Sequence, residues 1–214
     1  MKSVRFYYVR HGQTIFNLTQ KAQGWCDSPL TPLGISQAEE TAEKLKDIHF
    51  DSCYCSDFTR ARETCEPIMK YHDCQVIYHK GLREMNFGMM EGEIYDSITP
   101  NGMKISWRKR DFTDMLGENR EIFDKRIVRT INEIYEKAKD GDQILLVGHR
   151  GYCMEIMEHM FNLDPKKHDE VCIARGIERV PNGAVMIFEC TDGNYSLLQI
   201  PGLEDLSISD LQRD

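Results

Sequence analysis

Residues 4–14 read VRFYYVRHGQT, and residues 143–151 read QILLVGHRG. Each stretch is a run of apolar, β-favouring residues that ends at a histidine with a glycine beside it. The second run is continuously apolar, which is typical of a strand buried at the centre of a parallel sheet. Ligands of open parallel sheets bind outside the carboxyl ends of the strands. We therefore expect His11 and His149 to lie near one another, although they are far apart in the sequence.

The segments around these two runs alternate between strand and helix patterns. Thr31 followed by Pro32 indicates the start of a helix, because threonine is a good N-cap and proline suits the first helical position. Apolar residues at helical spacing predict helices, and short β-rich runs predict further strands. The predicted helices span residues 31–48, 59–71, 119–139 and 152–161, and the predicted strands span residues 4–9, 50–55, 143–147, 184–190 and 195–200. Alternating strands and helices indicate an α/β layered domain.

The chain has 214 residues, a length that favours one domain. We expect a single domain over residues 1–214, with a lid-like insert at about 86–117 and an acidic, unpatterned tail at about 201–214. The insert has weak periodicity and contains a basic cluster, for which the simplest interpretation is a run of solvated charges. The members of the basic cluster are Lys104, Arg108, Lys109 and Arg110.

The composition argues against several classes of protein. There are 27 Lys and Arg residues against 35 Asp and Glu residues, so the net charge is −8 at pH 7. An acidic chain is unsuited to general nucleic-acid binding, but a locally positive pocket can still hold an anionic substrate. No apolar run approaches the roughly 20 residues of a membrane span, and the N-terminal apolar run is too short for a secretory signal. We therefore expect a cytoplasmic protein whose eight cysteines stay reduced.

Six blocks of motif residues follow one another along the chain. They span residues 8–17, 23–34, 56–64, 82–92, 117–118 and 147–149. In this order they resemble the histidine phosphatase superfamily, in its phosphoglycerate-mutase-like branch, from residue 4 to about residue 190. The resemblance implies a three-layer α/β/α sandwich with a mostly parallel central sheet. It also implies a metal-independent phosphatase without a cofactor, which hydrolyses a small phosphomonoester through a covalent phosphohistidine.

The resemblance assigns catalytic roles to five residues, and the chemistry of each side chain suits its role. His11 is implied as the nucleophile, because a neutral imidazole is abundant near pH 7 and can form a covalent phosphoryl-enzyme. Arg10 and Arg60 would hold the phosphoryl oxygens through paired, charge-assisted hydrogen bonds. A protonated His149 would stabilise the charge that develops on the transferring group. Glu84 would protonate the departing alkoxide and then take a proton from the attacking water.

Further residues are implied to bind the substrate. The resemblance suggests that Asn17 and the backbone at Gln23 and Gly24 complete the phosphate pocket. Arg150 stands where many relatives carry a small residue, and its positive charge would favour doubly anionic substrates. The expected substrate-binding residues are Arg10, Asn17, Gln23, Gly24, Arg60, Phe87, His149 and Arg150.

Two other functions remain open on the sequence. A phosphoglycerate mutase would use the same covalent step but would have to hold water away from the intermediate. Glycolytic mutases of the family carry a larger basic segment after the acid–base residue, so the shorter segment here favours a hydrolase, while the basic cluster keeps the mutase open. The third function is a catalytically decayed protein that binds a phosphorylated ligand, although all five catalytic positions are intact.

Neither a metal nor a macromolecular ligand is expected. Soft ligands for zinc occur close together in the sequence, but they contain no C-x-x-C pair. These residues are Cys53, Cys55, Cys65, His72 and Cys74. The expected partner is a small phosphorylated metabolite, with no nucleic acid and no membrane. The sequence leaves a homodimer open, and it does not identify the natural substrate.

Overall fold

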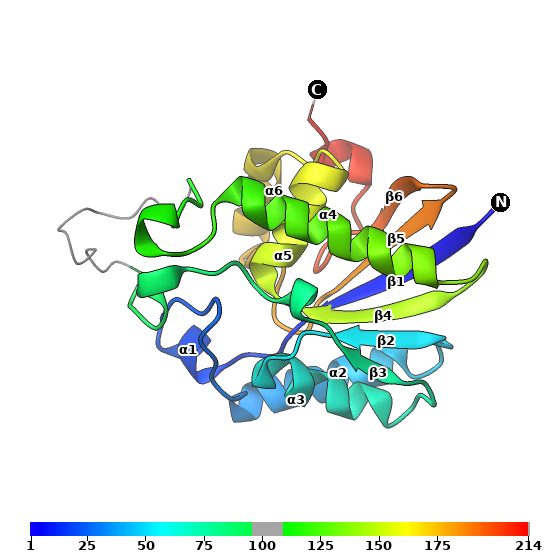
Figure 1. The fold of residues 1–214 in the computed structure, drawn as a ribbon, viewed down its shortest axis with the longest axis horizontal. Coiled ribbons are helices and arrows are strands. Elements are labelled where there is room, and N and C mark those ends of the chain that lie inside the picture. Colours follow the sequence, from blue (N-terminus) through cyan, green and yellow to red (C-terminus); the bar gives the residue numbers. More distant parts are fainter. Residues whose placement is uncertain (96–108, 214) are drawn as a thin grey trace.

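The computed structural model describes residues 1–95 and 109–213, which form a six-stranded sheet with helices on both faces (Figure 1). The strands are β1 (Ser3–Arg10), β2 (Ser52–Cys55), β3 (Val76–Tyr78), β4 (Gln143–Gly148), β5 (Val185–Thr191) and β6 (Asn194–Gln199). Their order in the sheet is β3-β2-β4-β1-β5-β6. Neighbours among β1 to β4 pair in parallel, and β5 and β6 add to one edge in antiparallel fashion. The predicted α/β class and mostly parallel sheet are confirmed.

Strands β1 and β4 are neighbours at the centre of the sheet, with Arg10 opposite Gly148. Each strand is followed by its histidine, so this register brings the two histidines to the same edge. The backbone N–H of His11 continues the ladder by donating to the carbonyl of Gly148 at 3.0 Å. The topology of the sheet thus explains why two sequence-distant histidines, His11 and His149, meet.

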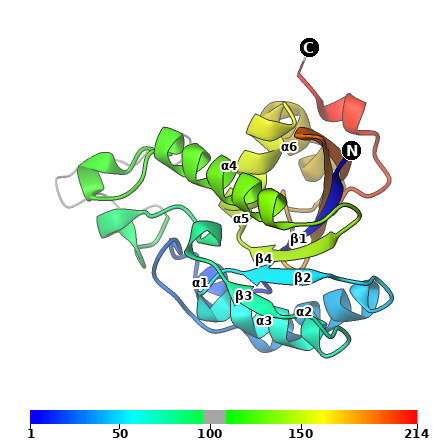
Figure 2. The ribbon, with the colours of Figure 1, turned by 45° about the vertical axis from the view of Figure 1, so that its right-hand side comes forward.

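Helices cover the two faces of the sheet in separate layers (Figure 2). The helices are α1 (Ile15–Leu18), α2 (Pro32–Leu45), α3 (Thr59–Met69), α4 (Arg120–Lys137), α5 (Arg150–Glu155) and α6 (Pro165–Arg175). Alternate residues of a strand point to opposite faces. Tyr7 and Val9 accordingly pack in the core formed with α2 and α3, whereas Phe6 and Tyr8 pack in the larger core formed with α4 and α5. The side chain of Thr31 accepts a hydrogen bond from the Gly34 N–H, so the predicted N-cap is confirmed.

The sequence patterns miss helix α1 and two further elements, and they misplace the bounds of others. Helix α1 has only four residues, and none of them is buried. Strand β3 has only three residues, none of them buried, and this leaves little apolar signal. Helix α6 buries only His168 and Cys172, so it has no apolar stripe, although Asp164 before Pro165 is an N-cap signal. Helix α5 begins two residues before the predicted start at residue 152, and it continues into a π-helix at Ile156–Met160.

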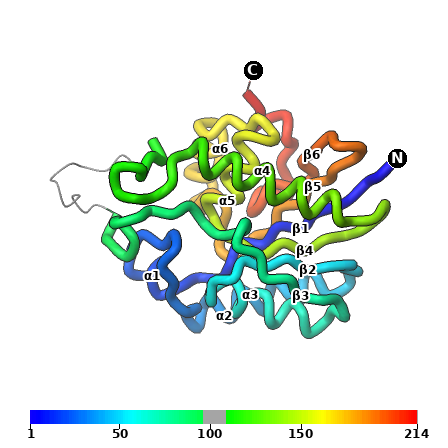
Figure 3. The backbone as a smooth tube through the Cα atoms, in the orientation of Figure 1, coloured from blue at the N-terminus to red at the C-terminus, as the bar shows by residue number. Residues whose placement is uncertain are grey.

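The predicted acidic tail is wrong for the described residues up to 213. Leu203 and Leu211 are each 1% exposed, and Ile208–Leu211 forms a 3-10 helix. The backbone N–H of Asp164 donates to the carbonyl of Leu211, so the segment lies beside the start of α6 (Figure 3). Its apolar residues are isolated among acidic ones and show no periodicity, which explains why the pattern did not indicate packing.

The predicted insert at about 86–117 is described only at its two flanks. Both flanks pack into the larger core, through Met90, Phe112 and Met115. Two members of the basic cluster lie outside the described residues, namely Lys104 and Arg108. Lys109 is exposed. The interpretation as solvated charge is wrong for Arg110, because its guanidinium forms ion pairs with the buried carboxylates of Glu155 and Glu158. Over the described residues, no helix is both long and apolar enough to cross a membrane.

Candidate active site

The ring of His11 is held in one tautomer at the carboxyl end of β1. Its Nδ1 lies 2.7 Å from the carbonyl oxygen of Gly12, and because a carbonyl can only accept, Nδ1 carries the proton. In the neutral ring, Nε2 therefore keeps its lone pair. Burial lowers the pKa of His11 well below its ordinary value, and the charges of Arg60 and Arg10 lower it further. His11 is thus neutral at pH 7, which is the form that can attack phosphorus.

The ring of His149 lies beside that of His11, with 5.3 Å between the ring centroids. The hydroxyl of Tyr8 fixes the backbone at this point, because it accepts from the His149 N–H at 2.7 Å and donates to the His149 carbonyl at 3.1 Å. A Cβ at Gly148 would collide with that hydroxyl, so the position requires glycine. The strand-end pattern predicts that the two histidines meet, and the structure brings them together.

Arg60 comes from the first turn of α3 and is completely buried. Its Nε donates to His149 Nδ1 at 3.2 Å, and its Nη2 donates to the carbonyl of Gly24 at 2.7 Å. Its Nη1 forms an ion pair with Asp27 at 3.0 Å. These bonds hold the guanidinium in a fixed orientation next to the two histidines. Arg62, on the same helix, is exposed.

Arg10 is also buried, and one of its donors has no partner. Its Nη1 donates to the carbonyl of Val180 at 2.6 Å and to Glu178 at 3.0 Å. Among the described residues, its Nε has no hydrogen-bond partner although it is shielded from solvent. A buried donor that stays unpaired costs free energy. Beside His11, this N–H is therefore suited to an anionic ligand.

The carboxylate of Glu84 is aimed at the start of α5, the helix that follows His149. Glu84 is 7% exposed, and its oxygens accept from the backbone N–H of Gly151 at 2.7 Å and of Met85 at 2.9 Å. A Cβ at Gly151 would collide with the carboxylate, so this glycine keeps the space open. Burial lowers the pKa of Arg60, and the charge of Glu84 opposes that shift, as does the charge of Asp27. Glu84 therefore lies within electrostatic reach of the buried guanidinium.

A third arginine, Arg126 on α4, holds the loop that carries Glu84. Its Nη1 donates to the carbonyls of Gly81 and Arg83 at 3.0 and 2.7 Å, and its Nη2 donates to the carbonyl of Glu84 at 3.0 Å. Its Nη2 also forms an ion pair with Glu118 at 2.7 Å. Sequence reasoning missed this residue, because a single arginine on a helix gives no local sign of its distant partners.

The backbone of the 24–26 loop is already bound by a carboxylate within the chain. The side chain of Glu91 accepts from the N–H groups of Gly24 at 2.9 Å, Trp25 at 2.6 Å and Cys26 at 3.0 Å. The backbone at Gln23 and Gly24 is predicted to complete the phosphate pocket, and at Gly24 the N–H is already bound by Glu91. Gly24 instead contributes its carbonyl, which orients Arg60.

The two remaining polar residues predicted for the phosphate pocket support the loops around it. The side chain of Gln23 accepts from Thr14 at 2.7 Å and donates to Ser28 at 3.0 Å. The side chain of Asn17 accepts from the Thr14 N–H, and it lies 3.4 Å from the amide nitrogen of Asn182, which also donates to the carbonyl of His11. Both residues are thus tied to the segment that follows the first histidine.

A cavity of about 190 Å³ opens beside Glu84. Three of the predicted substrate residues line it, namely Gln23, Phe87 and Arg150. The other walls are mainly apolar and aromatic, and they include Phe112, Phe123 and Met154. This combination suits the organic part of a phosphorylated molecule better than it suits the phosphate itself.

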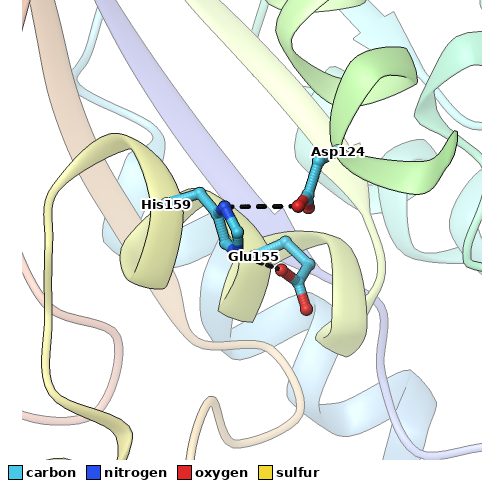
Figure 4. Close-up of side chains that lie close together, drawn as sticks. All are labelled: Asp124, Glu155 and His159. Atoms are coloured by element: carbon cyan, nitrogen blue, oxygen red, sulfur yellow. Dashed lines mark ion pairs between the residues drawn. The ribbon is translucent and has the colours of Figure 1, made fainter. Parts of the chain in front are cut away.

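One group of side chains has the composition of a metal site (Figure 4). Nδ1 of His159 lies 3.2 Å from Asp124, and its Nε2 lies 3.1 Å from Glu155. However, Arg120 donates to the same oxygen of Glu155 at 3.0 Å, and Arg110 forms an ion pair with its other oxygen. A cation there would be repelled by two guanidinium groups. The arginines already balance the carboxylate of Glu155, so the group is poorly suited to a metal.

The family model described as Histidine phosphatase superfamily (branch 1) matches residues 6–201. Among curated proteins, the chain is similar to Probable phosphoglycerate mutase GpmB of Escherichia coli. The two are 32% identical over 155 residues, which cover 68% of this chain and 69% of that protein.

Solved structures have the same fold. A phosphoglycerate mutase from Bacillus anthracis matches with a TM-score of 0.77 and 32% identity, over 92% of each chain. The alpha-ribazole phosphatase from Shigella flexneri matches with a TM-score of 0.77 and 24% identity, over 94% of this chain and 96% of that chain. A phosphoserine phosphatase variant from Entamoeba histolytica, in complex with phosphoserine, matches with a TM-score of 0.74 and 23% identity, over 95% of this chain and all of that chain. At these identities, the two phosphatases support the fold alone.

Proposed function

Because the chain belongs to the histidine phosphatase superfamily, branch 1, we propose that it is a metal-independent phosphatase of small phosphomonoesters. In this proposal the reaction passes through a phosphohistidine at His11. Arg10, Arg60 and His149 hold the phosphoryl group, and Glu84 moves the proton. The expected ligand is a small phosphorylated metabolite.

One observation carries the proposal. His11 is a buried, neutral imidazole whose Nδ1 is bonded to the Gly12 carbonyl, so its Nε2 keeps the lone pair. Arg60 and Arg10 both act on its pKa, so their charges lie close to the ring. A nucleophile in a positive, buried setting is suited to a phosphoryl group, because the negative oxygens are stabilised while the lone pair stays available.

The first half of the proposed reaction makes one bond and breaks another. Nε2 of His11 forms a bond to phosphorus as the bond between phosphorus and the ester oxygen breaks. Glu84, in its protonated form, gives its proton to the departing alkoxide. Arg10 and Arg60 hold the phosphoryl oxygens, and His149 stabilises the charge that spreads over them.

The second half returns the enzyme to its starting state. A water molecule attacks phosphorus on the side that the alcohol has left, and Glu84 takes its proton. The bond between His11 and phosphorus breaks, inorganic phosphate leaves, and Glu84 is again protonated. Arg126, which also forms an ion pair with Glu118, keeps the loop that carries Glu84 in place during both halves of the reaction.

A phosphoglycerate mutase is the second candidate, and a specific finding favours it. Two of the relatives that are 32% identical to this chain, one from Escherichia coli and one from Bacillus anthracis, carry the name phosphoglycerate mutase. A mutase would use the same phosphohistidine but would return the phosphoryl group to the substrate. We favour the hydrolase because the segment between Glu84 and α4 is shorter than in glycolytic mutases of the family.

Turnover in the presence of EDTA tests the proposal. We expect the protein to release phosphate from p-nitrophenyl phosphate, and His11→Ala to lower kcat by at least about 10³-fold. His49→Ala, at an exposed histidine, is the matched control. With 3-phosphoglycerate, with and without 2,3-bisphosphoglycerate, release of phosphate without the 2-isomer supports the hydrolase. Formation of the 2-isomer supports the mutase, and phosphate binding without turnover supports a decayed binding protein.

A further inference from the structure

Two cavities meet at Arg150, the residue directly after His149. The first is the cavity of about 190 Å³ beside Glu84, which faces the departing group in the proposed reaction. The second has a volume of about 520 Å³ and lies between α5 and α6. Arg110, Arg150 and Met154 line both cavities. A ligand in the first cavity can therefore contact the side chain of Arg150.

The other arginines of this region are already matched by carboxylates. Arg110 pairs with Glu155, and Arg120 pairs with both Glu155 and Glu158. Arg179 pairs with Glu158 at 3.0 Å. Two carboxylates that are less than 10% exposed thus hold three guanidinium groups in fixed positions. These arginines therefore stabilise the α5–α6 region through ion pairs within the protein.

Arg150 differs from them, because its terminal nitrogens are unused. Its Nε donates to the carbonyl of Arg179 at 3.0 Å, and its nearest carboxylate is Glu178, at 3.9 Å. Within the described part of the chain, neither Nη of Arg150 makes a hydrogen bond. The side chain is 43% exposed, so it can meet a ligand that enters from solvent. A guanidinium with two free donor groups is suited to a carboxylate or a phosphate.

The position of Glu178 is consistent with an anionic group of a ligand binding near Arg150. One oxygen of Glu178 lies 3.0 Å from Nη1 of Arg10 and 3.9 Å from Nε of Arg150. An exposed carboxylate thus lies between the arginine beside His11 and the arginine at the edge of the first cavity. The charge of Arg150 also acts on the pKa of Arg10, which is lowered mainly by burial. The two guanidinium groups are therefore near enough to bind two anionic groups of one molecule.

We propose that Arg150 binds a second anionic group, a carboxylate or a phosphate, on a phosphomonoester whose organic part lies in the cavity beside Glu84. This inference rests on the proposed function, and it names the substrate class. The walls formed by Phe112, Phe123 and Met154 suit an apolar or aromatic organic part. The substrate class is thus a phosphomonoester with a compact apolar body and a second negative charge at its far end.

The test uses two esters that differ in one charge. These are 4-carboxyphenyl phosphate and 4-carbamoylphenyl phosphate, which have nearly the same shape and similar leaving groups. We expect the enzyme to favour the carboxylate ester by about tenfold in kcat/KM, the size of effect expected for a charge-assisted hydrogen bond at a half-exposed site. Arg150→Gln should reduce the ratio of the two kcat/KM values to about one, and Arg150→Lys should keep part of it.

A matched control is Arg5→Gln, which removes one positive charge from an arginine that is 45% exposed, near the start of β1. Arg5→Gln should leave the preference unchanged, and thermal unfolding of each variant checks that it is folded. An equal rate with both esters, or a preference that persists in folded Arg150→Gln, overturns the inference and leaves the proposed function standing. Failure to hydrolyse both esters while p-nitrophenyl phosphate is hydrolysed overturns this inference alone, and failure with p-nitrophenyl phosphate as well overturns the proposed function.

Discussion

Nε of Arg60 donates a hydrogen bond to Nδ1 of His149, across 3.2 Å, in the buried space beside His11. A guanidinium can only donate, so Nδ1 of His149 is an acceptor and the neutral ring carries its proton on Nε2. That proton is directed to the hydroxyl of Ser56, 2.8 Å away. Both ring nitrogens of His149 are thus hydrogen-bonded within the protein, Nδ1 to Arg60 and Nε2 to Ser56.

The hydrogen bond from Arg60 predicts a change of protonation when an anion binds. Burial lowers the pKa of His149 well below its ordinary value, and the charge of Arg60 lowers it further. Inorganic phosphate or vanadate would compete for Arg60 and bring negative charge, which raises the pKa of a nearby histidine. We expect ¹⁵N NMR at pH 7 to show a neutral His149 without ligand and a protonated ring with ligand. A ring that is already protonated without ligand would contradict the account.

Replacing the proposed acid–base group should separate substrates by their leaving groups. Glu84→Gln should lower kcat for an alkyl phosphomonoester by about 10² to 10⁴, because the alkoxide needs a proton as it leaves. The loss should be smaller for p-nitrophenyl phosphate, whose leaving group is a much weaker base. Glu93→Gln, at an exposed position in the same segment, is the control. Equal losses on both substrates would show that Glu84 does not act as the acid.

Arg126 should affect the reaction because it fixes the position of Glu84. Arg126→Lys keeps the positive charge but loses the guanidinium that donates to three backbone carbonyls, so the loop that carries Glu84 can move. We expect kcat for the alkyl ester to fall by about tenfold with little change in KM, and we expect p-nitrophenyl phosphate to be less affected. Arg129→Lys, at an exposed position on the same helix, should change neither rate. If Arg126→Lys lowers stability alone, with both rates unchanged, the positioning role is wrong.

Buried neutral histidines should make the protein sensitive to acid. Burial is the main cause that lowers the pKa of His11, of His149 and of His168, the last to about 4. The unfolded chain takes up protons near pH 6.5 and the folded protein does not, so stability is greatest above pH 6.5 and falls as the pH decreases. Each such histidine can contribute up to about 2 kcal/mol to the loss between pH 6.5 and 5.

His168 lies away from the proposed reaction, so it gives a clean test of this pH dependence. His168→Gln should flatten the decline in the free energy of unfolding between pH 6.5 and 5, measured by urea denaturation. His49→Gln, at a histidine that is 81% exposed, is the control and should leave the slope as it is. An unchanged slope in His168→Gln would mean that His168 is not held neutral in the folded protein.

The sequence predicts the parts of the fold that have strong local patterns. The central strands and α4 are continuous or periodic in their apolar residues, so their places could be predicted. Helix α6 buries only two residues along its length, and the segment that ends at Leu211 packs through isolated apolar side chains. In both cases tertiary contacts stabilise the structure, and these contacts produce no clear pattern in the local sequence.

The same distinction applies to the candidate site. Arg10 and His11 stand in one short motif after a strand, so both could be found from local sequence. The contact of Arg126 with the Glu84 loop joins residues 42 positions apart, and Tyr8 fixes the backbone of His149 from 141 positions away. Such supporting contacts depend on how the chain folds back on itself, and no spacing rule predicts them.

The central claim is that phosphorus is bonded to His11 during turnover. The most direct measurement is rapid quenching of the enzyme with a radiolabelled phosphomonoester, followed by peptide mapping under alkaline conditions, in which phosphohistidine is stable. The account predicts an acid-labile label on the peptide that contains His11, formed and lost at rates that match turnover, and absent from His11→Ala. Steady release of phosphate with no label on the protein, or a label on another residue, would contradict it.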